Sequence, residues 1–213
     1  LERMNMEYFD IYWIHNPIGA PEYTKQLVPL LADGRVKSVG VSNHNLAQLK
    51  EADAILKEAG YRISAVQNHY SLLNRSSEKS GIIDYCKEND IVFYGYMTLE
   101  QGALSGKYDT AHPFPEGSAR AKTFNPLLPQ IEMITAELKK VAGAHGASAA
   151  QIATAYAINK GVLPILGVTK LYQVEEAVKI ADIVLTSDEI AALEAAADKS
   201  GVISIQFWES KME

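Results

Sequence analysis

Short apolar runs, rich in β-branched and aromatic residues, alternate with segments of helical periodicity along the whole chain. Five such runs are found, at residues 8–14, 36–41, 63–66, 91–96 and 162–166. Runs of this length, bounded by Gly and polar residues, are typical of strands in a parallel sheet that is covered on both faces. The alternation of strands with helices predicts an α/β fold with right-handed crossover connections.

Helix-capping signals stand between the predicted strands. Asn45 with Gln48, and Thr186 with Glu189, form capping-box patterns ahead of apolar periodic segments. Further helices are expected over 78–89, over 128–145 and from Ser148 onward. Segment 98–129 contains Gly, Pro and Ser but little periodicity, so we expect a long loop there. Loops of that length in a compact domain commonly serve as lids or binding loops.

Charge and cysteine content narrow the class of protein. The 213 residues carry 20 Lys and Arg against 26 Asp and Glu, a net charge of −6 that argues against non-specific nucleic-acid binding. No apolar run approaches the length of a membrane span. The single cysteine, Cys86, excludes an internal disulfide and fits a reducing compartment, so we expect a cytoplasmic protein. The five histidines lack metal-ligand spacing, and no glycine-rich nucleotide loop or nucleophile elbow is present.

Polar or small residues come directly after each predicted strand. They are His15-Asn16-Pro17, Ser42-Asn43, Gln67-Asn68, Tyr96-Met97-Thr98 and Gly167-Val168-Thr169-Lys170. Each alone has a structural explanation: a strand-end histidine, a turn with a helix cap, a tied loop, a core tyrosine. In parallel α/β folds, however, ligands bind at the carboxyl ends of strands, where loops converge on one surface. The coincidence at five strand ends favours one shared ligand pocket.

Five motifs in one order closely resemble the aldo-keto reductases. They are Asp-Ile-Tyr-Trp-Ile-His-Asn-Pro (10–17), Gly-Arg-Val-Lys-Ser-Val-Gly-Val-Ser-Asn (34–43), Gln-Asn-His-Tyr (67–70), Gly-Ala-Leu-Ser-Gly-Lys-Tyr (102–108) and the stretch 167–177. The resemblance runs from Leu1 to about Asp198. It implies a TIM-type (β/α)8 barrel, of which residues 1–213 would form a single domain holding roughly strands four to eight. It also implies an NAD(P)H-dependent oxidoreductase that reduces aldehydes or ketones to alcohols, with NADP(H) as the expected cofactor and NAD(H) as the alternative.

The resemblance assigns roles at the nicotinamide end of such a cofactor. His15 looks like the catalytic histidine that orients the substrate carbonyl and assists proton transfer. Ser42, Asn43 and Gln67 look like the groups that bind the nicotinamide carboxamide and so fix which ring face presents its hydride. Tyr96 looks like the aromatic residue that stacks on the nicotinamide ring.

Two further segments resemble the rest of the dinucleotide site. The residues similar to the loop around the pyrophosphate are Leu99, Gly102, Leu104 and Lys107. Those similar to the clamp on the adenosine end are Gly167, Thr169, Lys170, Gln173 and Glu176, among which Thr169 and Lys170 are expected donors to a 2′-phosphate. Val174 and Ala177 depart from the family pattern, since an arginine and an asparagine are common there. These departures leave the choice between NADP and NAD open.

The family's catalytic aspartate, tyrosine and lysine have no counterpart in the sequence. The chain opens on Leu1 and matches the family pattern only from just before its fourth strand, so we expect an N-terminally truncated barrel. Without the tyrosine and lysine, hydride transfer lacks its acid, and the chain alone is expected to be inactive. Five barrel strands also leave two sheet edges unpaired, which favours a homo-oligomer or a missing N-terminal segment as partner. Candidates for lining a substrate pocket are Trp13, Asn16 and the tail 203–208.

Two other interpretations remain open. The first is a non-catalytic aldo-keto-reductase-like module that binds nucleotide or a partner protein, because loop 98–129 resembles that of potassium-channel β-subunits. The second is a complete open α/β domain that binds no ligand. The enzyme interpretation expects a small-molecule carbonyl substrate, and none of the three expects a nucleic acid, a membrane or a metal as partner.

Overall fold

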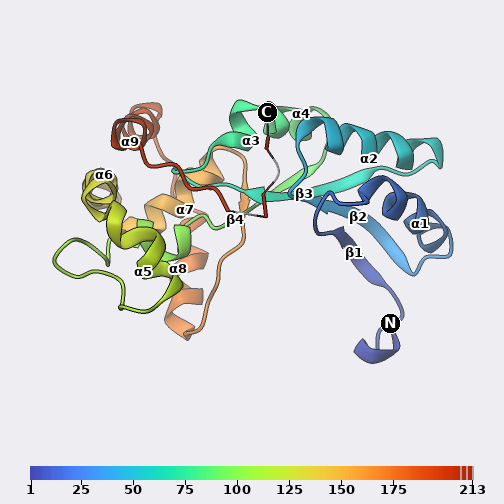
Figure 1. Cartoon of the computed structure of the whole chain (residues 1–213), viewed down its shortest axis with the longest axis horizontal. Helices are drawn as coiled ribbons and strands as arrows, with labels where there is room; N and C mark the ends of the chain where they lie inside the picture. The colour runs from blue at the N-terminus through green and yellow to red at the C-terminus, as the bar shows by residue number, and fades with distance from the viewer. Residues whose placement is uncertain (207, 210, 213) are drawn as a thin grey trace. The chain divides into compact units, whose positions relative to one another are not determined.

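The computed structural model describes residues 1–206, 208–209 and 211–212, in which strands and helices alternate along the chain (Figure 1). The strands form a five-stranded sheet in the order β1-β2-β3-β4-β5. The α/β prediction is therefore confirmed. The chain divides into two compact units, one of Leu1–His69, Ser76–Tyr94 and Gln206–Glu213, and one of Tyr70–Arg75 and Gly95–Ile205.

The first unit is built on parallel strands. They are β1 (Phe9–Ile14), β2 (Val36–Ser42), β3 (Ile63–His69) and the start of β4 (Val92–Tyr96). β2 pairs in parallel with both β1 and β3, and the register places Trp13 opposite Gly40 and Ser42 opposite Gln67. The β2–β3 pairing therefore extends further than expected, so that Ser42, Gln67 and Asn68 lie inside strands and do not follow them.

The helices of the first unit are η1 (Glu2–Met4), α1 (Ala20–Ala32), α2 (Leu46–Glu58), α3 (Ser76–Lys79) and α4 (Ile82–Glu88). The capping box expected at the start of α2 is present: the Asn45 side chain accepts the Gln48 N–H at 2.9 Å, and the Gln48 side chain accepts the Asn45 N–H at 2.9 Å. The single helix expected over 78–89 is wrong. Gly81, in the left-handed region at φ 78°, separates α3 from α4.

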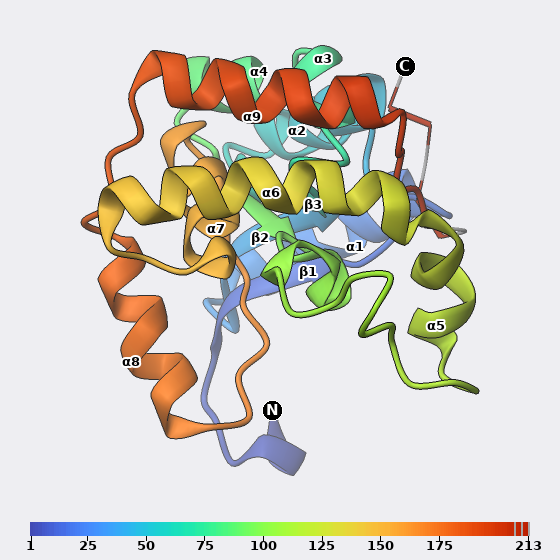
Figure 2. The same cartoon turned by 90° about the vertical axis from the view of Figure 1, so that its left-hand side faces the viewer.

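The second unit is mostly helical. It holds the end of β4, the two-residue β5 (Leu163–Pro164), η2 (Glu100–Ser105), α5 (Ala119–Phe124), η3 (Asn125–Leu127), α6 (Leu128–His145), α7 (Ala149–Asn159), α8 (Leu171–Ile180) and α9 (Ser187–Ser200). α6 packs along α9 and against α7 (Figure 2). Segment 98–129 thus contains η2, α5 and η3, and α6 has the bounds expected from its periodicity.

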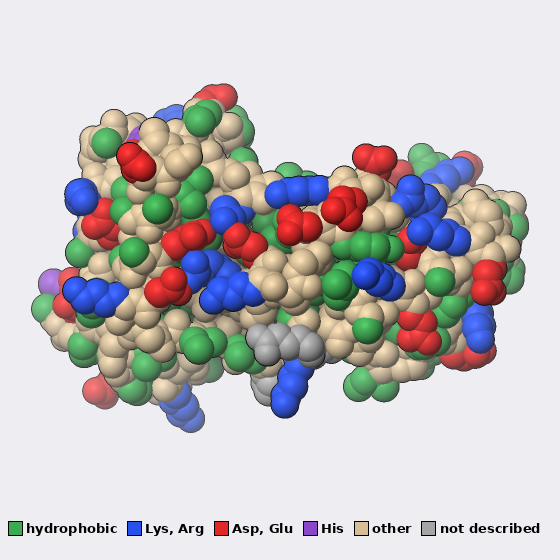
Figure 3. Space-filling model, turned by 90° about the horizontal axis from the view of Figure 1, so that it is seen from above, with side chains coloured by type: hydrophobic (Ala, Val, Ile, Leu, Met, Phe, Trp, Pro, Cys, Tyr) green, Lys and Arg blue, Asp and Glu red, His purple; other side chains and the backbone are tan. Residues whose placement is uncertain are grey.

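Packing and capping explain the helices of the second unit. Tyr70 and Tyr156 are both fully buried and stack with their ring centroids 6.3 Å apart. Ser148 caps α7 and Thr186 caps α9, each in a capping box. On the face shown in Figure 3, acidic and basic side chains are interspersed and do not gather into one patch of a single sign.

Candidate functional site

In the first unit, the carboxyl ends of β1, β2 and β3 bring His15, Ser42, Asn43 and Gln67 together, and we call these four residues the strand-end cluster. The Asn43 side-chain amide donates to the His15 carbonyl oxygen at 3.0 Å. The Ser42 hydroxyl donates to the Gln67 carbonyl oxygen at 2.7 Å, and the Asn43 backbone N–H donates to the same oxygen at 3.1 Å. Three strand ends are therefore joined by hydrogen bonds from two consecutive residues.

The side chains of Ser42 and Asn43 are buried and make hydrogen bonds within the protein. Ser42 is 1% exposed and Asn43 is 3% exposed, and the Asn43 amide also donates to the Ser42 hydroxyl oxygen at 3.2 Å. Asn43 takes a left-handed φ of 61°, a conformation that asparagine tolerates better than most residues. In this structure the two side chains brace the ends of the strands.

His15 and Gln67 supply the other two side chains of the strand-end cluster, and these are accessible to solvent. The imidazole of His15 is exposed, and the side-chain amide of Gln67 is half-buried. Neither group makes a hydrogen bond to another residue in the described part of the chain. A cleft of about 390 Å³ borders His15 and is also lined by Trp13 and Asn16, the two residues expected near a substrate. Phe207, in the tail expected to line the same pocket, lies outside the described residues.

A close contact between β1 and β2 fixes Trp13 beside this cluster. Gly40 lies opposite Trp13, and a Cβ atom added to Gly40 would stand 2.5 Å from two carbons of the indole ring. The edge of the indole also meets Tyr94, with ring centroids 5.7 Å apart and the planes at 87°. Only glycine at position 40 lets the indole take this place.

A buried histidine next to the cluster was not singled out from the sequence. His44 is fully buried, and its Nδ1 lies 2.8 Å from the Ser42 carbonyl oxygen, a contact in which Nδ1 donates. Burial lowers the pKa of His44, which favours the neutral imidazole. The Asn68 amide donates to the His44 carbonyl oxygen at 2.9 Å. These buried polar groups support the base of the cluster, and no local sequence pattern distinguishes them from surface residues.

In the second unit, the loop expected to wrap a pyrophosphate is tightly wound. The Leu99 carbonyl oxygen accepts the Gly102 N–H at 2.8 Å and the Leu104 N–H at 3.2 Å. Leu104 is fully buried, whereas Lys107 is exposed and its ammonium lies 5.3 Å from the centre of the Tyr108 ring. Gly102 has a φ of 102°, which only glycine adopts without strain.

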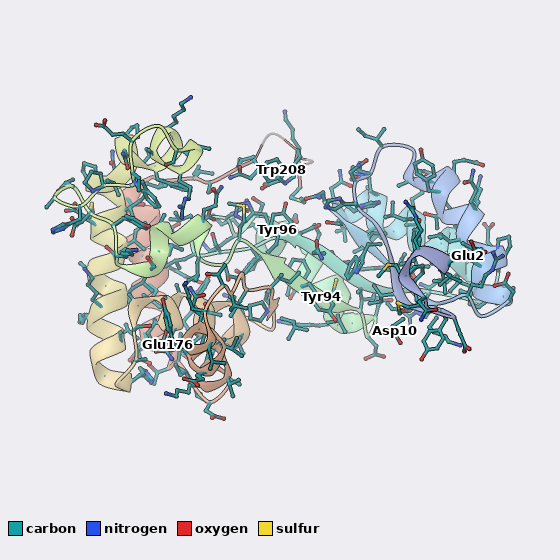
Figure 4. All side chains as sticks on the ribbon, turned by 90° about the horizontal axis from the view of Figure 1, so that it is seen from below. Glu2, Asp10, Tyr94, Tyr96, Glu176 and Trp208 are labelled. Atoms are coloured by element: carbon teal, nitrogen blue, oxygen red, sulfur yellow. The ribbon has the colours of Figure 1, made fainter. Side chains whose placement is uncertain are left out.

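The segment expected to clamp the adenosine leads into α8. The Gln173 side-chain oxygen accepts the backbone N–H groups of Thr169 at 2.7 Å and Lys170 at 2.9 Å. Gln173 thereby fixes the turn before the helix. Gly167, Thr169, Lys170 and Glu176 are exposed to solvent, and Glu176 lies on α8 (Figure 4).

Tyr96, the residue expected to stack on a nicotinamide, ends β4 in the second unit (Figure 4). Its ring is half-buried, and its carbonyl oxygen accepts the Tyr70 N–H at 3.2 Å. The structure thus groups the candidate residues in three sets: the strand-end cluster, the loop 99–107 after Tyr96, and the turn 167–176.

Neither a metal cluster nor a membrane span is found in the part of the chain that the structure describes. No three His, Cys, Asp or Glu side chains there come together as metal ligands. No helix there is both long enough and apolar enough to cross a membrane.

Comparison with known proteins identifies the family. The model of the aldo/keto reductase family matches residues 1–198, and the chain therefore belongs to this family. A chloroplastic pyridoxal reductase of Arabidopsis thaliana is 34% identical over 180 residues, which cover 84% of this chain and 49% of that protein. The aldo-keto reductase yakc [NADP(+)] of Schizosaccharomyces pombe is 26% identical over 97% of this chain and 62% of its own length.

Two solved structures share the fold. The glycerol dehydrogenase AKR11B4 of Gluconobacter oxydans superposes with a TM-score of 0.81 at 25% identity, covering 97% of this chain and 64% of that chain. The thermostable aldo-keto reductase Tm1743 superposes with a TM-score of 0.73 over 92% of this chain and 62% of its own. The chain thus spans about half to two thirds of the length of these relatives.

Proposed function

We propose that this chain belongs to an NAD(P)H-dependent oxidoreductase that reduces aldehydes or ketones to alcohols, and that it supplies the cofactor site and the catalytic histidine. The observation that carries the proposal is the strand-end cluster, in which Ser42 and Asn43 hold three strand ends while the side chains of His15 and Gln67 stay available. Family membership supports this interpretation. NADP(H) is the proposed cofactor and NAD(H) the alternative, supported by the NADP(+) in the name of the fission-yeast relative.

The residues of the first unit fit the carboxamide end of such a cofactor. A primary amide both donates and accepts, so the Gln67 side chain is able to make a paired hydrogen bond with a carboxamide. Ser42 and Asn43 keep the backbone that carries Gln67 and His15 in place. His15 orients the carbonyl of the substrate and assists proton transfer to it. The bound nicotinamide supplies the hydride.

The residues of the second unit are proposed to hold the rest of the dinucleotide. Tyr96 stacks on the ring, and Leu99, Gly102 and Leu104 shape the loop beside the pyrophosphate. Lys107 offers an exposed cation to the phosphates. The turn formed by Gly167, Thr169, Lys170, Gln173 and Glu176 takes the adenosine end, and a phosphate there is favoured by the N-terminus of α8.

We further propose that the described strands are strands four to eight of a (β/α)8 barrel and that residues 1–213 act as one incomplete domain with a binding loop at 98–129. β1 is the end strand of the sheet, and Tyr12 on it and Ile18 after it are exposed. An N-terminal segment of the whole protein, or a second copy of the chain, would cover this edge. A cytoplasmic location remains a prediction.

Cofactor binding is tested by titrating NADPH into the chain and following tryptophan fluorescence. We expect quenching that saturates, and a Kd about tenfold higher in Gln67→Ala, because the paired hydrogen bond with the carboxamide is lost. Glu58→Ala is the control, because Glu58 is an exposed residue at the end of α2 in the first unit and does not line the cleft beside His15. Absence of quenching in the unmodified chain would overturn the proposal.

The phosphate preference is tested with the same titration. Lys170→Ala should weaken NADPH binding several-fold and leave NADH binding unchanged, because only NADPH carries the 2′-phosphate. Lys179→Ala, at the other end of α8, serves as the control. Equal losses for both cofactors would contradict the assignment of Lys170.

The proposed inactivity of the chain alone is tested by mixing it with NADPH and a reactive aldehyde. We expect no oxidation of NADPH above background, because no residue of the sequence matches the family's proton-donating tyrosine and its lysine. Measured turnover by the 213-residue chain would refute this expectation. Binding without turnover, even in a longer form of the protein that includes those residues, would instead favour the non-catalytic module.

A further inference from the structure

Glu100 is a fully buried acidic residue within the loop that is proposed to bind the cofactor phosphates. Its carboxylate accepts a hydrogen bond from the Ser71 hydroxyl on one oxygen and from the Ser204 hydroxyl, at 2.6 Å, on the other. Burying a carboxylate is unfavourable unless hydrogen bonds compensate for the lost water. A position held at such a cost calls for an explanation beyond the filling of space.

The backbone around Glu100 is strained. Met97, Glu100 and Gln101 have φ values of 59°, 48° and 54°, and Gly102 follows at 102°. Each non-glycine residue in this region is strained, and such conformations persist only where the surroundings enforce them. The Glu100 N–H donates to the Met97 carbonyl oxygen at 2.8 Å, so side chain and backbone of Glu100 hold the same turn.

The two hydroxyl groups of Ser71 and Ser204 donate to the Glu100 carboxylate, which thereby links two other segments to the loop. The Ser71 oxygen already accepts the N–H groups of Leu73 and Asn74, both at 3.0 Å, so its proton points to Glu100. Ser204 lies after α9, and its carbonyl oxygen accepts the Asn74 amide at 2.8 Å. The carboxylate therefore ties the turn 71–74 and the segment after α9 to the loop.

We propose that Glu100, held by Ser71 and Ser204, is a positioning residue that sets loop 97–104 in the conformation in which it binds the phosphates of a dinucleotide. The inference deepens the proposed function and rests on it. It makes Ser204, 104 residues after Glu100, a contributor to cofactor affinity although it is buried away from the solvent.

Three variants separate positioning from general stability. Glu100→Ala removes both acceptors, and we expect its Kd for NADPH to rise about tenfold, the effect of losing roughly 1.4 kcal/mol. Ser204→Ala removes one donor and should raise the Kd about threefold, a smaller share of the same effect. Glu100→Gln keeps an acceptor for Ser71 and offers Ser204 a donor, so its Kd should stay within about twofold of the unmodified chain.

The control is Thr135→Ala on α6, which removes a buried hydroxyl of the same unit whose one hydrogen bond among the described residues goes to the Glu132 carbonyl oxygen. It should lower stability and leave the Kd unchanged. Amide hydrogen exchange of the peptide that spans 97–104, measured without cofactor, gives a readout independent of binding. We expect the amides of this peptide to exchange faster in Glu100→Ala and Ser204→Ala than in the unmodified chain. In Glu100→Gln and Thr135→Ala the exchange rate should be unchanged.

The outcomes separate the two proposals. If the unmodified chain binds NADPH and Glu100→Ala binds it equally well, positioning by Glu100 is overturned while the proposed function stands. If exchange in 97–104 is the same in all four variants, positioning is overturned as well. If the unmodified chain fails to quench with NADPH, the proposed function itself is overturned.

Discussion

Replacing Gly40 with alanine tests the contact that places Trp13 beside His15. The new Cβ would stand 2.5 Å from two indole carbons, whereas carbon atoms pack best at about 3.5–4.0 Å, so the ring must move by about 1 Å. Such overpacking costs roughly 1–3 kcal/mol. Loss of the edge-to-face contact with Tyr94 adds about 0.5–1.5 kcal/mol.

An opposing effect reduces this cost. Alanine loses less backbone entropy than glycine in a strand, which returns roughly 0.5–1 kcal/mol. We therefore expect Gly40→Ala to lower the free energy of unfolding by about 2 kcal/mol, seen as a fall of about 1 M in the urea midpoint. The emission of Trp13, isolated in a Trp208→Phe background, should change as the indole leaves its place.

A double-mutant cycle tests whether the indole of Trp13 causes the loss of stability in Gly40→Ala. In a Trp13→Ala background the new methyl group has room, so Gly40→Ala should become neutral or stabilising by about 0.5 kcal/mol. Gly143→Ala, in the last turn of α6 with no atom within 4 Å of the added Cβ, should stabilise by up to about 1 kcal/mol. A Gly40→Ala variant as stable as the unmodified chain, or equal losses in both backgrounds, would show that the contact between Gly40 and Trp13 is not the cause.

Three further predictions concern the protein as a whole. Burial raises the pKa of Cys86 to about 12, so the native chain should not react with a thiol reagent at pH 8, and fast labelling before unfolding would contradict this. Asn45→Ala breaks the capping box of α2 and should cost about 1 kcal/mol in urea unfolding, against no loss in an exposed control on the same helix. The backbone N–H of Thr186 holds the pKa of Glu189 below its ordinary 4.5, so stability from this pair is present above pH 4.5 and is lost as the pH falls further. Glu189→Gln should remove that acid-side loss, and an unchanged pH profile would refute it.

Local chemistry made much of the fold predictable. A capping box needs only residues three apart, so the starts of α2 and α9 follow from Asn45 and Thr186 alone. The periodicity of 128–145 likewise gives the bounds of α6. α8 escaped prediction because Leu171 and Val178 are exposed in the structure, and its apolar positions do not mark a buried face.

The site shows where sequence reasoning ends. The strand ends predict that His15, Ser42 and Gln67 meet, because parallel strands share an edge. Which of their side chains remain available depends on backbone partners about 25 residues away, and no local pattern encodes those. Glu100 is the sharper case, since an acidic residue in a polar loop is normally solvated, and its partner Ser204 is 104 residues distant.

The difference between committed and available side chains decides how variants of the site should be interpreted. Ser42 is 1% exposed and bonds to the backbone of the next strand, so its substitution disturbs the strand ends whether or not a cofactor binds there. Gln67 is half-buried and its amide bonds to nothing in the described residues, so its loss breaks no hydrogen bond within that part of the chain. A fall in NADPH affinity in Ser42→Ala is therefore ambiguous between folding and binding. The same fall in Gln67→Ala, at unchanged stability, is evidence of contact with the cofactor.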